Sequence, residues 1–116
     1  TRGGVAAVLN ELASASGVGV RLRESDTPIR ADVQGFCEIL GLDPLYLANE
    51  GKIVAVVPPE QEAAALQALR AHPLGSGAAA IGRITDTRPG RVVMETRFGG
   101  ERIVDMLVGD QLPRIC

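Results

Sequence analysis

The spacing of apolar and polar residues predicts two amphipathic helices in the first half of the chain. In residues 4–16 the apolar side chains recur at i, i+3, i+4 and i+7, and Gly17 follows as a stop signal. Residues 32–41 repeat this spacing, with Asp32 placed to cap the helix. Cys37 falls on the apolar face of the second helix, so we expect it to lie in the core.

Two other stretches of the first half have the pattern of β-strands. Residues 18–23 alternate apolar side chains with Gly or Arg, as in a half-buried strand. Residues 53–57 are continuously apolar and mostly β-branched, and Pro58 and Pro59 end the run. This composition predicts a central strand that is buried on both faces.

The second half of the chain is predicted to form one helix and three strands. An alanine-rich helix is expected over residues 60–71, followed by a strand within residues 79–87. Residues 91–97 and 101–107 are rich in β-forming residues and flank a glycine turn, which predicts a hairpin. The order of the elements predicts an α+β domain, with helices packed on one face of a mixed β-sheet.

The composition indicates a globular domain and argues against a nucleic-acid or membrane protein. The 116 residues are 46% hydrophobic, which is enough to build a core, and 12 basic side chains nearly balance 14 acidic ones. One tyrosine, two phenylalanines and a net charge of −2 leave little for binding nucleic acid. No apolar run approaches the roughly 20 residues that span a bilayer, and no signal-peptide pattern opens the chain.

The two cysteines and the single histidine give no framework for a disulfide or a metal site. Cys37 is expected in a helix and Cys116 is the last residue, so the two are not expected to pair, and a reducing, cytoplasmic setting fits best. His72 follows the third predicted helix and precedes Pro73, which is typical of a loop at a helix end. We therefore expect no metal site built from the protein's own residues.

The last eight residues, 109–116, are predicted to form a flexible tail after a domain of residues 1–108. They contain Gly and Pro, follow no helical or alternating period and end in Cys116. Fully extended, they span about 26 Å, so the thiol could visit more than one site. From the residues alone, Cys116 is either a reactive thiol or an ordinary terminal residue. Because the chain opens on Thr1 rather than Met, we also expect it to be a piece whose preceding domain is missing.

Four short motifs are distributed along the whole chain. They are Thr1-Arg2-Gly3-Gly4, Ala48-Asn49-Glu50-Gly51-Lys52, Phe98-Gly99-Gly100 and Pro113-Arg114-Ile115-Cys116. The terminal motif is the most specific of the four. Together they resemble the C-terminal domain of the HypE family of hydrogenase maturation proteins. The resemblance implies a fold similar to the C-terminal domain of aminoimidazole ribonucleotide synthetase, in a superfamily that also includes selenophosphate synthetase.

The resemblance implies that Cys116 carries the substrate of an ATP-dependent carbamoyl dehydratase. In that family the partner HypF transfers a carbamoyl group to the terminal thiol, and ATP with Mg²⁺ then activates the amide oxygen for loss as phosphate. The remaining thiocyanate passes cyanide to iron held by HypC and HypD, for the [NiFe] hydrogenase centre. A thiol suits this task because its thiolate is a good nucleophile, and a tail can present it to two proteins in turn.

The other motifs supply groups that the tail could approach. Glu50 is the candidate base for the amide proton, held in a turn before the predicted strand at 53–57, with Asn49 to orient it; without the resemblance it would be an ordinary exposed turn residue. The first four residues precede a helix, where free N–H groups and the helix dipole favour phosphate. The resemblance implies that ATP and the tail bind at Thr1, Arg2, Gly3, Gly4 and Asn49, and that Pro113, Arg114 and Ile115 belong to the tail.

Two alternatives to this function stay open. The chain could be a partner-binding or dimerisation module with no catalytic residue, or the C-terminal domain of another ATP-dependent member of the superfamily. Cys116 argues against the second alternative, since those chemistries give a terminal thiol no task. The resemblance also implies a homodimer for the intact protein, and a fragment that is inactive by itself because the ATP-binding domain is missing.

Overall fold

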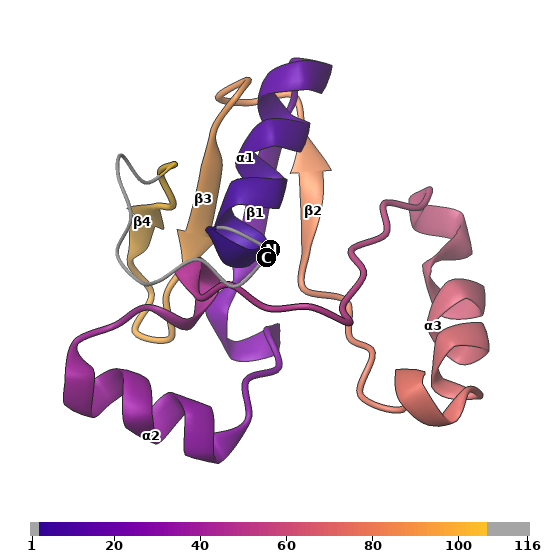
Figure 1. Ribbon diagram of the computed structural model, residues 1–116. Helices are drawn as coiled ribbons and strands as arrows, with labels where there is room; N and C mark the ends of the chain where they lie inside the picture. The colour runs from indigo at the N-terminus through magenta and orange to yellow at the C-terminus, as the bar shows by residue number, and fades with distance from the viewer. Residues whose placement is uncertain (1–2, 107–116) are drawn as a thin grey trace.

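The structure is a computed structural model that describes residues 3–106. Within that range, helices and strands follow one another along the chain, with short 3-10 turns between them (Figure 1). The helices and strands are α1 (Gly4–Ser16), β1 (Gly19–Arg23), α2 (Ala31–Leu40), α3 (Glu62–Arg70), β2 (Gly82–Thr85), β3 (Val92–Glu95) and β4 (Glu101–Ile103). Three of the 3-10 turns are important below: η2 (Pro44–Tyr46), η3 (Pro59–Gln61) and η4 (Pro73–Gly75).

The strands form a mixed sheet in the order β2-β1-β3-β4. β1 pairs antiparallel with β2 and parallel with β3, in a register that sets Val20 opposite Val92. β3 and β4 form an antiparallel hairpin. The α+β class, the mixed sheet and the predicted hairpin are therefore confirmed, as is a strand within residues 79–87.

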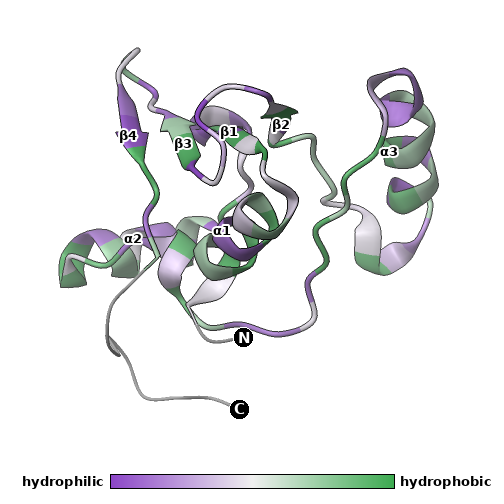
Figure 2. Ribbon diagram, turned by 90° about the horizontal axis from the view of Figure 1, so that it is seen from above, coloured by the Kyte–Doolittle hydropathy of each residue, from purple (hydrophilic) through white to green (hydrophobic). Residues whose placement is uncertain are grey.

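One face of the sheet is covered by α1, whose apolar stripe meets the strands (Figure 2). The buried side chains of this core are Ala6, Leu9, Ala13, Val20, Leu22, Leu45, Val92, Met94 and Val104. Gly17 ends α1 in the left-handed conformation, and its N–H donates to the carbonyl oxygen of Ala13, as predicted. The core joins α1, β1, β3 and η2, which are the parts of the chain that position the candidate site.

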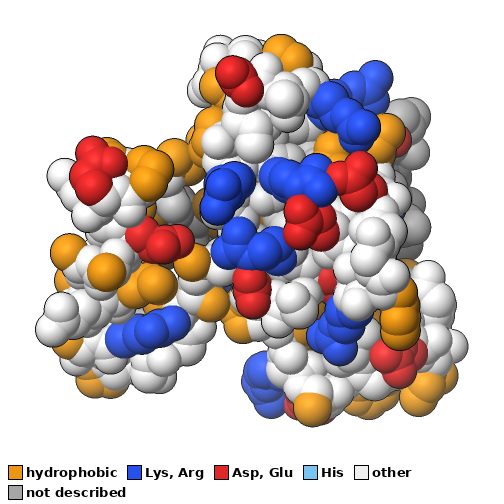
Figure 3. Space-filling model, turned by 180° about the vertical axis from the view of Figure 1, so that it is seen from behind, with side chains coloured by type: hydrophobic (Ala, Val, Ile, Leu, Met, Phe, Trp, Pro, Cys, Tyr) orange, Lys and Arg blue, Asp and Glu red, His pale blue; other side chains and the backbone are white. Residues whose placement is uncertain are grey.

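The opposite face of the sheet carries charges of both signs (Figure 3). Arg21 on β1 lies 2.6 Å from Glu95 on β3 and also pairs with Glu101 on β4. Hydrogen bonds to Glu95 and then to Glu101 raise the pKa of Arg21. Because basic and acidic side chains alternate there, this face offers no continuous positive surface for a nucleic acid.

Residues 53–57 do not form the predicted central strand. They pair with no strand of the sheet, and Ile53 is 79% exposed while Val56 is 56% exposed. The central positions of the sheet are occupied by β1 and β3 instead. The prediction was wrong because an apolar, β-branched run shows only that a stretch suits a sheet, whereas the rest of the fold decides whether it pairs.

The other two helices differ from the prediction in their starts or their packing. Arg30 has an extended backbone, so α2 begins at Ala31; Asp32 is therefore not the cap, and it accepts the N–H of Val33 instead. Cys37 is buried, as predicted. α3 has no buried residue and stands beside the β2 edge rather than over the sheet (Figures 1 and 2).

Candidate functional site

The start of α1 approaches η2 so closely that position 4 requires glycine. Gly3 and Gly4 have positive φ angles of 72° and 62°. A Cβ atom on Gly4 would lie 2.4 Å from the carbonyl oxygen of Leu47 and 2.5 Å from that of Leu45. Glycine therefore meets two demands here, a left-handed backbone and the close approach of two chain segments.

The start of α1 combines an uncapped helix end with a buried Gly4, which faces the carbonyl oxygens of Leu45 and Leu47. No side chain caps α1, and its first turn contains no acidic residue. The N–H groups in the first turn of a helix have no partner within the helix, and the helix dipole adds positive charge there. These features fit a nucleotide phosphate, so the predicted role of Gly3 and Gly4 in ATP binding is compatible with the structure and stays a prediction.

The turn η2, which packs against α1, is fixed by its own residues and by β4. Asp43 accepts the N–H of Leu45 at 3.0 Å, and Pro44 occupies the first position of the turn. The other carboxylate oxygen of Asp43 lies 2.8 Å from the Arg102 guanidinium. Leu45 is buried in the core, so it anchors η2 and the beginning of the segment that follows it.

Asn49 and Glu50 follow η2, the turn that packs against α1. The Nδ2 atom of Asn49 donates to the carbonyl oxygen of Leu47 at 3.1 Å. The same carbonyl oxygen faces Gly4, so it connects the predicted motif at residues 1–4 with the one at residues 48–52. Glu50 is exposed, and no side chain among residues 3–106 pairs with its carboxylate. The carboxylate is therefore accessible from the surface of the domain.

The neighbours of Glu50 in the structure differ from those that were predicted. Asn49 binds the Leu47 carbonyl oxygen rather than the Glu50 carboxylate, and residues 53–57 form no strand behind it. Gly51 has a φ angle of 76° and turns the chain directly after Glu50. Glu50 is thus positioned by η2, which precedes it, and not by a strand that follows it.

Six predicted site residues lie outside the part of the chain that the structure describes. They are Thr1, Arg2, Pro113, Arg114, Ile115 and Cys116. The predicted boundary at residue 108 and the tail at 109–116 lie outside it as well. Of the remaining four, Gly3 and Gly4 form the start of α1, Asn49 is joined to Gly4 through the Leu47 carbonyl oxygen, and Glu50 is the exposed neighbour of Asn49.

Two polar side chains that sequence reasoning missed bind the chain directly after β4. Asn10 Nδ2 donates to the carbonyl oxygens of Val104 at 2.9 Å and Ala6 at 2.8 Å. Tyr46 Oη donates to the carbonyl oxygen of Asp105 at 2.6 Å. Asn10 lies one turn after Ala6 on the inner side of α1, where a polar side chain needs a hydrogen-bond partner. A polar residue at that position could therefore have been recognised from the sequence. Tyr46 gave no such signal because its partner is 59 residues away.

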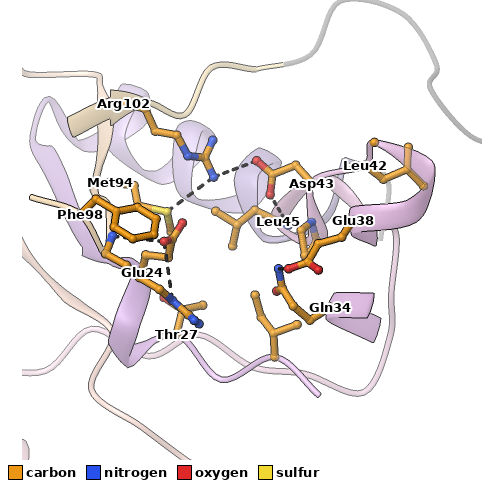
Figure 4. Close-up of a pocket in the computed structure, with 14 residues that line it drawn as sticks. Glu24, Thr27, Gln34, Glu38, Leu42, Asp43, Leu45, Met94, Phe98 and Arg102 are labelled. Carbon is orange, nitrogen blue, oxygen red and sulfur yellow. Dashed lines mark hydrogen bonds and ion pairs between the residues drawn. The ribbon is translucent and has the colours of Figure 1, made fainter. Parts of the chain in front are cut away.

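A hollow of about 490 Å³ lies between α2, η2 and the β3–β4 hairpin (Figure 4). Four of its charged groups form ion pairs, Asp43 with Arg102 at 2.8 Å and Glu24 with Arg97 at 3.6 Å, while Glu38 accepts the side-chain amide of Gln34. None of the four described site residues lines it. The hollow is therefore separate from the place where the predicted residues meet.

Residues 3–106 contain no group of three or more His, Cys, Asp or Glu side chains suited to a metal ion. In the same range, no helix combines the length and the apolar character needed to cross a membrane. His72 Nδ1 accepts the N–H of Leu74 at 3.1 Å after α3, so the predicted helix-end loop is confirmed.

Known proteins match this chain in sequence and in fold. The model of the AIR synthase related protein C-terminal domain matches residues 1–95. The carbamoyl dehydratase HypE of Rhodobacter capsulatus is 59% identical over all 116 residues, which cover 34% of that protein. The chain thus spans about a third of the length of the curated relatives that it matches.

Two solved structures share the fold. A crystal structure of hydrogenase maturation protein HypE in complex with ATP matches the whole chain and 36% of its own chain, with a TM-score of 0.90 and 48% identity. The crystal structure of a HypE–HypF complex matches 92% of this chain and 34% of its own, with a TM-score of 0.87 and 42% identity. The chain therefore belongs to the family of AIR synthase related proteins, as a C-terminal domain similar to that of the HypE hydrogenase maturation proteins.

Proposed function

We propose that the chain is the cysteine-bearing part of an ATP-dependent carbamoyl dehydratase that acts in [NiFe] hydrogenase maturation. The observation that carries this proposal is the approach of Gly4 to the Leu47 carbonyl oxygen, which also accepts Asn49 Nδ2 and so joins the uncapped start of α1 to the segment that carries the exposed Glu50. A phosphate site next to an exposed carboxylate suits a reaction in which phosphate leaves and a proton is removed. The relatives named carbamoyl dehydratase and the HypE structure with ATP support this interpretation.

In the first step, Cys116 accepts the carbamoyl group. Its thiolate attacks the carbonyl carbon of an activated carbamoyl donor, the leaving group of the donor departs, and a thiocarboxamide, S–CO–NH₂, results. HypF is the proposed donor, since a HypE relative has been solved in a HypE–HypF complex. Because this step needs a free thiol, we place it in a reducing compartment, the cytoplasm.

In the second step, Glu50 removes a proton from the amide nitrogen. ATP, with Mg²⁺ on its phosphates, supplies the phosphoryl group that makes the amide oxygen a leaving group. The nitrogen loses one proton to solvent when the oxygen is phosphorylated and the second to Glu50 as inorganic phosphate departs, which leaves S–C≡N on Cys116. Gly3 and Gly4, with Thr1 and Arg2, bind phosphate at the start of α1. Asn49 holds the Leu47 carbonyl oxygen and so fixes the turn that carries Glu50.

The remaining steps concern the intact protein and its partners. We propose that the cyanide passes to iron held by HypC and HypD, and that the intact protein is a homodimer, as the HypE resemblance implies. The chain spans about a third of the length of its relatives, so we do not expect it to dehydrate the thiocarboxamide alone.

The mass of the peptide that ends in Cys116 tests the proposal in the full-length protein. With HypF, carbamoyl phosphate and ATP, we expect this peptide to gain a carbamoyl group and then to lose one water, which gives the cyano adduct. When ATP is omitted, only the first change is expected. A peptide whose mass never changes would contradict the proposal.

The substitution Glu50→Gln tests the role of Glu50 as the base independently of the role of Cys116 as the carbamoyl acceptor. We expect carbamoylation of Cys116 to proceed normally and dehydration to slow by about 10²- to 10⁴-fold, the usual contribution of a general base. Glu60→Gln is the matched control, because Glu60 is an exposed glutamate in η3. Equal dehydration in the wild type and in Glu50→Gln would remove Glu50 from the mechanism.

A second candidate function is a partner-binding module without a catalytic residue. The observation that favours it is the exposure of large apolar side chains, with Phe98 at 99% and Leu74 at 93%. Deleting residues 112–116 distinguishes the two candidates. If partners still bind and only the modification is lost, the tail carries the reacting group and is not a docking peptide.

A further inference from the structure

Residues 53–57, which lead from η2 towards η3 and α3 (Figure 1), are a run of apolar side chains that the described chain leaves uncovered. All five residues are exposed, with Ile53 at 79% and Val56 at 56%. Within residues 3–106, no hydrogen bond involves a backbone N–H or carbonyl group of this run. The run therefore presents apolar side chains and unpaired backbone groups together, a combination that native proteins rarely leave in water.

The composition of the run suits a strand that is covered on both faces. Successive side chains of a strand point to opposite faces, so Ile53 would fall on one face and Val54 and Val56 on the other. Both faces would thus be apolar. Exposed edge strands usually carry a charged residue or a proline that prevents further pairing, whereas residues 53–57 contain neither. The run is suited to the middle of a sheet and not to an exposed edge.

The run also has the boundaries of a complete strand. Gly51 turns the chain before it with a φ angle of 76°, and Pro58 and Pro59 follow it at the start of η3. Its length is close to the usual strand length of about five to six residues. The four strands of the described sheet do not include it, so its partner lies elsewhere.

We propose that residues 53–57 are an interface segment, which in the intact protein pairs as a strand with a part of the same polypeptide outside these 116 residues. The chain covers 34% of its Rhodobacter capsulatus relative, so about two-thirds of such a protein could supply the partner strand. A partner on the same polypeptide has a much higher effective concentration than a separate molecule. It must present apolar side chains, because those of the run are uncharged on both faces.

Amide hydrogen exchange of residues 53–57 tests the proposal without any measurement of activity. In the 116-residue chain these amides should exchange nearly as fast as those of an unfolded peptide, since no hydrogen bond protects them. In the full-length protein, the paired amides should exchange at least about 100-fold more slowly. Pairing along one edge protects alternate amides, and pairing along both edges protects all of them. Mass spectrometry of the peptide that contains the run measures the protection.

The strand β3 provides the internal reference. It pairs with β1 on one side and β4 on the other, so its amides should be protected in both proteins. Protection of β3 shows that the 116-residue chain is folded under the conditions of the experiment. If β3 exchanges rapidly in that chain, the exchange of residues 53–57 in the full-length protein decides by itself.

Two isoleucines provide matched substitutions, because Ile53 is 79% exposed and Ile39 in α2 is 82% exposed. In the full-length protein, Ile53→Lys should speed the exchange of residues 54–57 by at least about tenfold, since pairing would bury the lysine. Ile39→Lys should leave this exchange unchanged. In the 116-residue chain, neither substitution should alter it, because residues 53–57 are exposed there. Equal exchange in wild type and Ile53→Lys would contradict a covered strand.

The outcomes distinguish a partner on the same polypeptide from other partners. Slow exchange that persists when the full-length protein is diluted to monomers supports the proposal. Protection that disappears on this dilution would assign the partner strand to a second copy, and protection that requires HypF would assign it to that protein. Either result would overturn the proposal, as would rapid exchange of residues 53–57 in every sample. None of these results depends on whether Cys116 accepts a carbamoyl group, so the proposed function stands or fails separately.

Discussion

Two regions of the described chain differ in how they are stabilised. We call residues 3–50 and 82–106 the sheet region, and residues 51–78 the arm. Every buried apolar side chain of residues 3–106 lies in the sheet region, and the arm has none. The arm exposes large apolar side chains, such as Ile53 at 79% and Leu74 at 93%, and the sheet region exposes others in addition to its core, such as Phe98 at 99%. Figure 2 shows α3 of the arm standing apart from the strands.

The difference teaches that helix formation and tertiary stability are separate properties in this chain. α1 and α3 are both regular helices, but α1 buries Leu9 in the core, whereas α3 contacts mainly its flanking turns η3 and η4. A helix of nine residues is marginal in water by itself, and packing usually supplies its stability. We therefore expect the sheet region to unfold cooperatively and the arm to open locally at lower free energy.

The largest expected effect comes from truncating a leucine in the sheet region. Leu22 is 2% exposed, so Leu22→Ala should lower the free energy of unfolding by about 2–5 kcal/mol, through lost burial and the cavity left behind. Leu66→Ala in α3 is the matched substitution in the arm, and it should cost less than about 1 kcal/mol because no residue of α3 is buried. Urea titration followed by circular dichroism measures both. Equal losses would show that the two regions form one cooperative unit.

A pair of glycines provides a second comparison, with a smaller expected effect. Gly4 and Gly51 both have positive φ angles, 62° and 76°, but only Gly4 faces backbone atoms, whereas nothing lies within 4 Å of a Cβ atom on Gly51. Gly51→Ala should therefore cost about 1–2 kcal/mol for the left-handed backbone alone. Gly4→Ala should cost a further 1–3 kcal/mol, because the start of α1 must move away from Leu47. Similar unfolding midpoints for the two variants would mean that α1 and η2 are not packed as described.

The same contrast explains which features could be predicted from the sequence. Helical spacing and a glycine stop located α1, and the glycine turn located the β3–β4 hairpin, because both signals are local. The run at residues 53–57 was misassigned because its composition suits a buried strand, while its environment depends on distant parts of the chain. Local signals therefore identified elements well and their packing less well.

The candidate site likewise combines residues that could be found from the sequence with contacts that could not. Asn49 and the glycine at position 4 were found by motif, and the structure joins them through the Leu47 carbonyl oxygen, a backbone atom that no motif indicates. Tyr46 was missed because its hydrogen bond joins η2 to the chain after β4. Contacts between distant segments involve backbone carbonyl groups, which every residue possesses, so the sequence carries little information about them.

The smallest expected effect concerns the link between η2 and the chain after β4, and it is measurable because Tyr46 is the only tyrosine and the chain has no tryptophan. Burial and the Asp43 carboxylate raise the pKa of Tyr46 above 10.0, so the phenolate absorbance of the folded chain should appear at higher pH than that of the chain in urea. The folded state then binds this proton more tightly than the unfolded state. Its contribution to stability is complete below pH 10 and is lost as the pH rises through the folded-state pKa. Equal midpoints in the two states would mean that the Tyr46 hydroxyl is solvated in the folded chain, whereas Leu66→Ala in the arm should leave the midpoint of the folded chain unchanged.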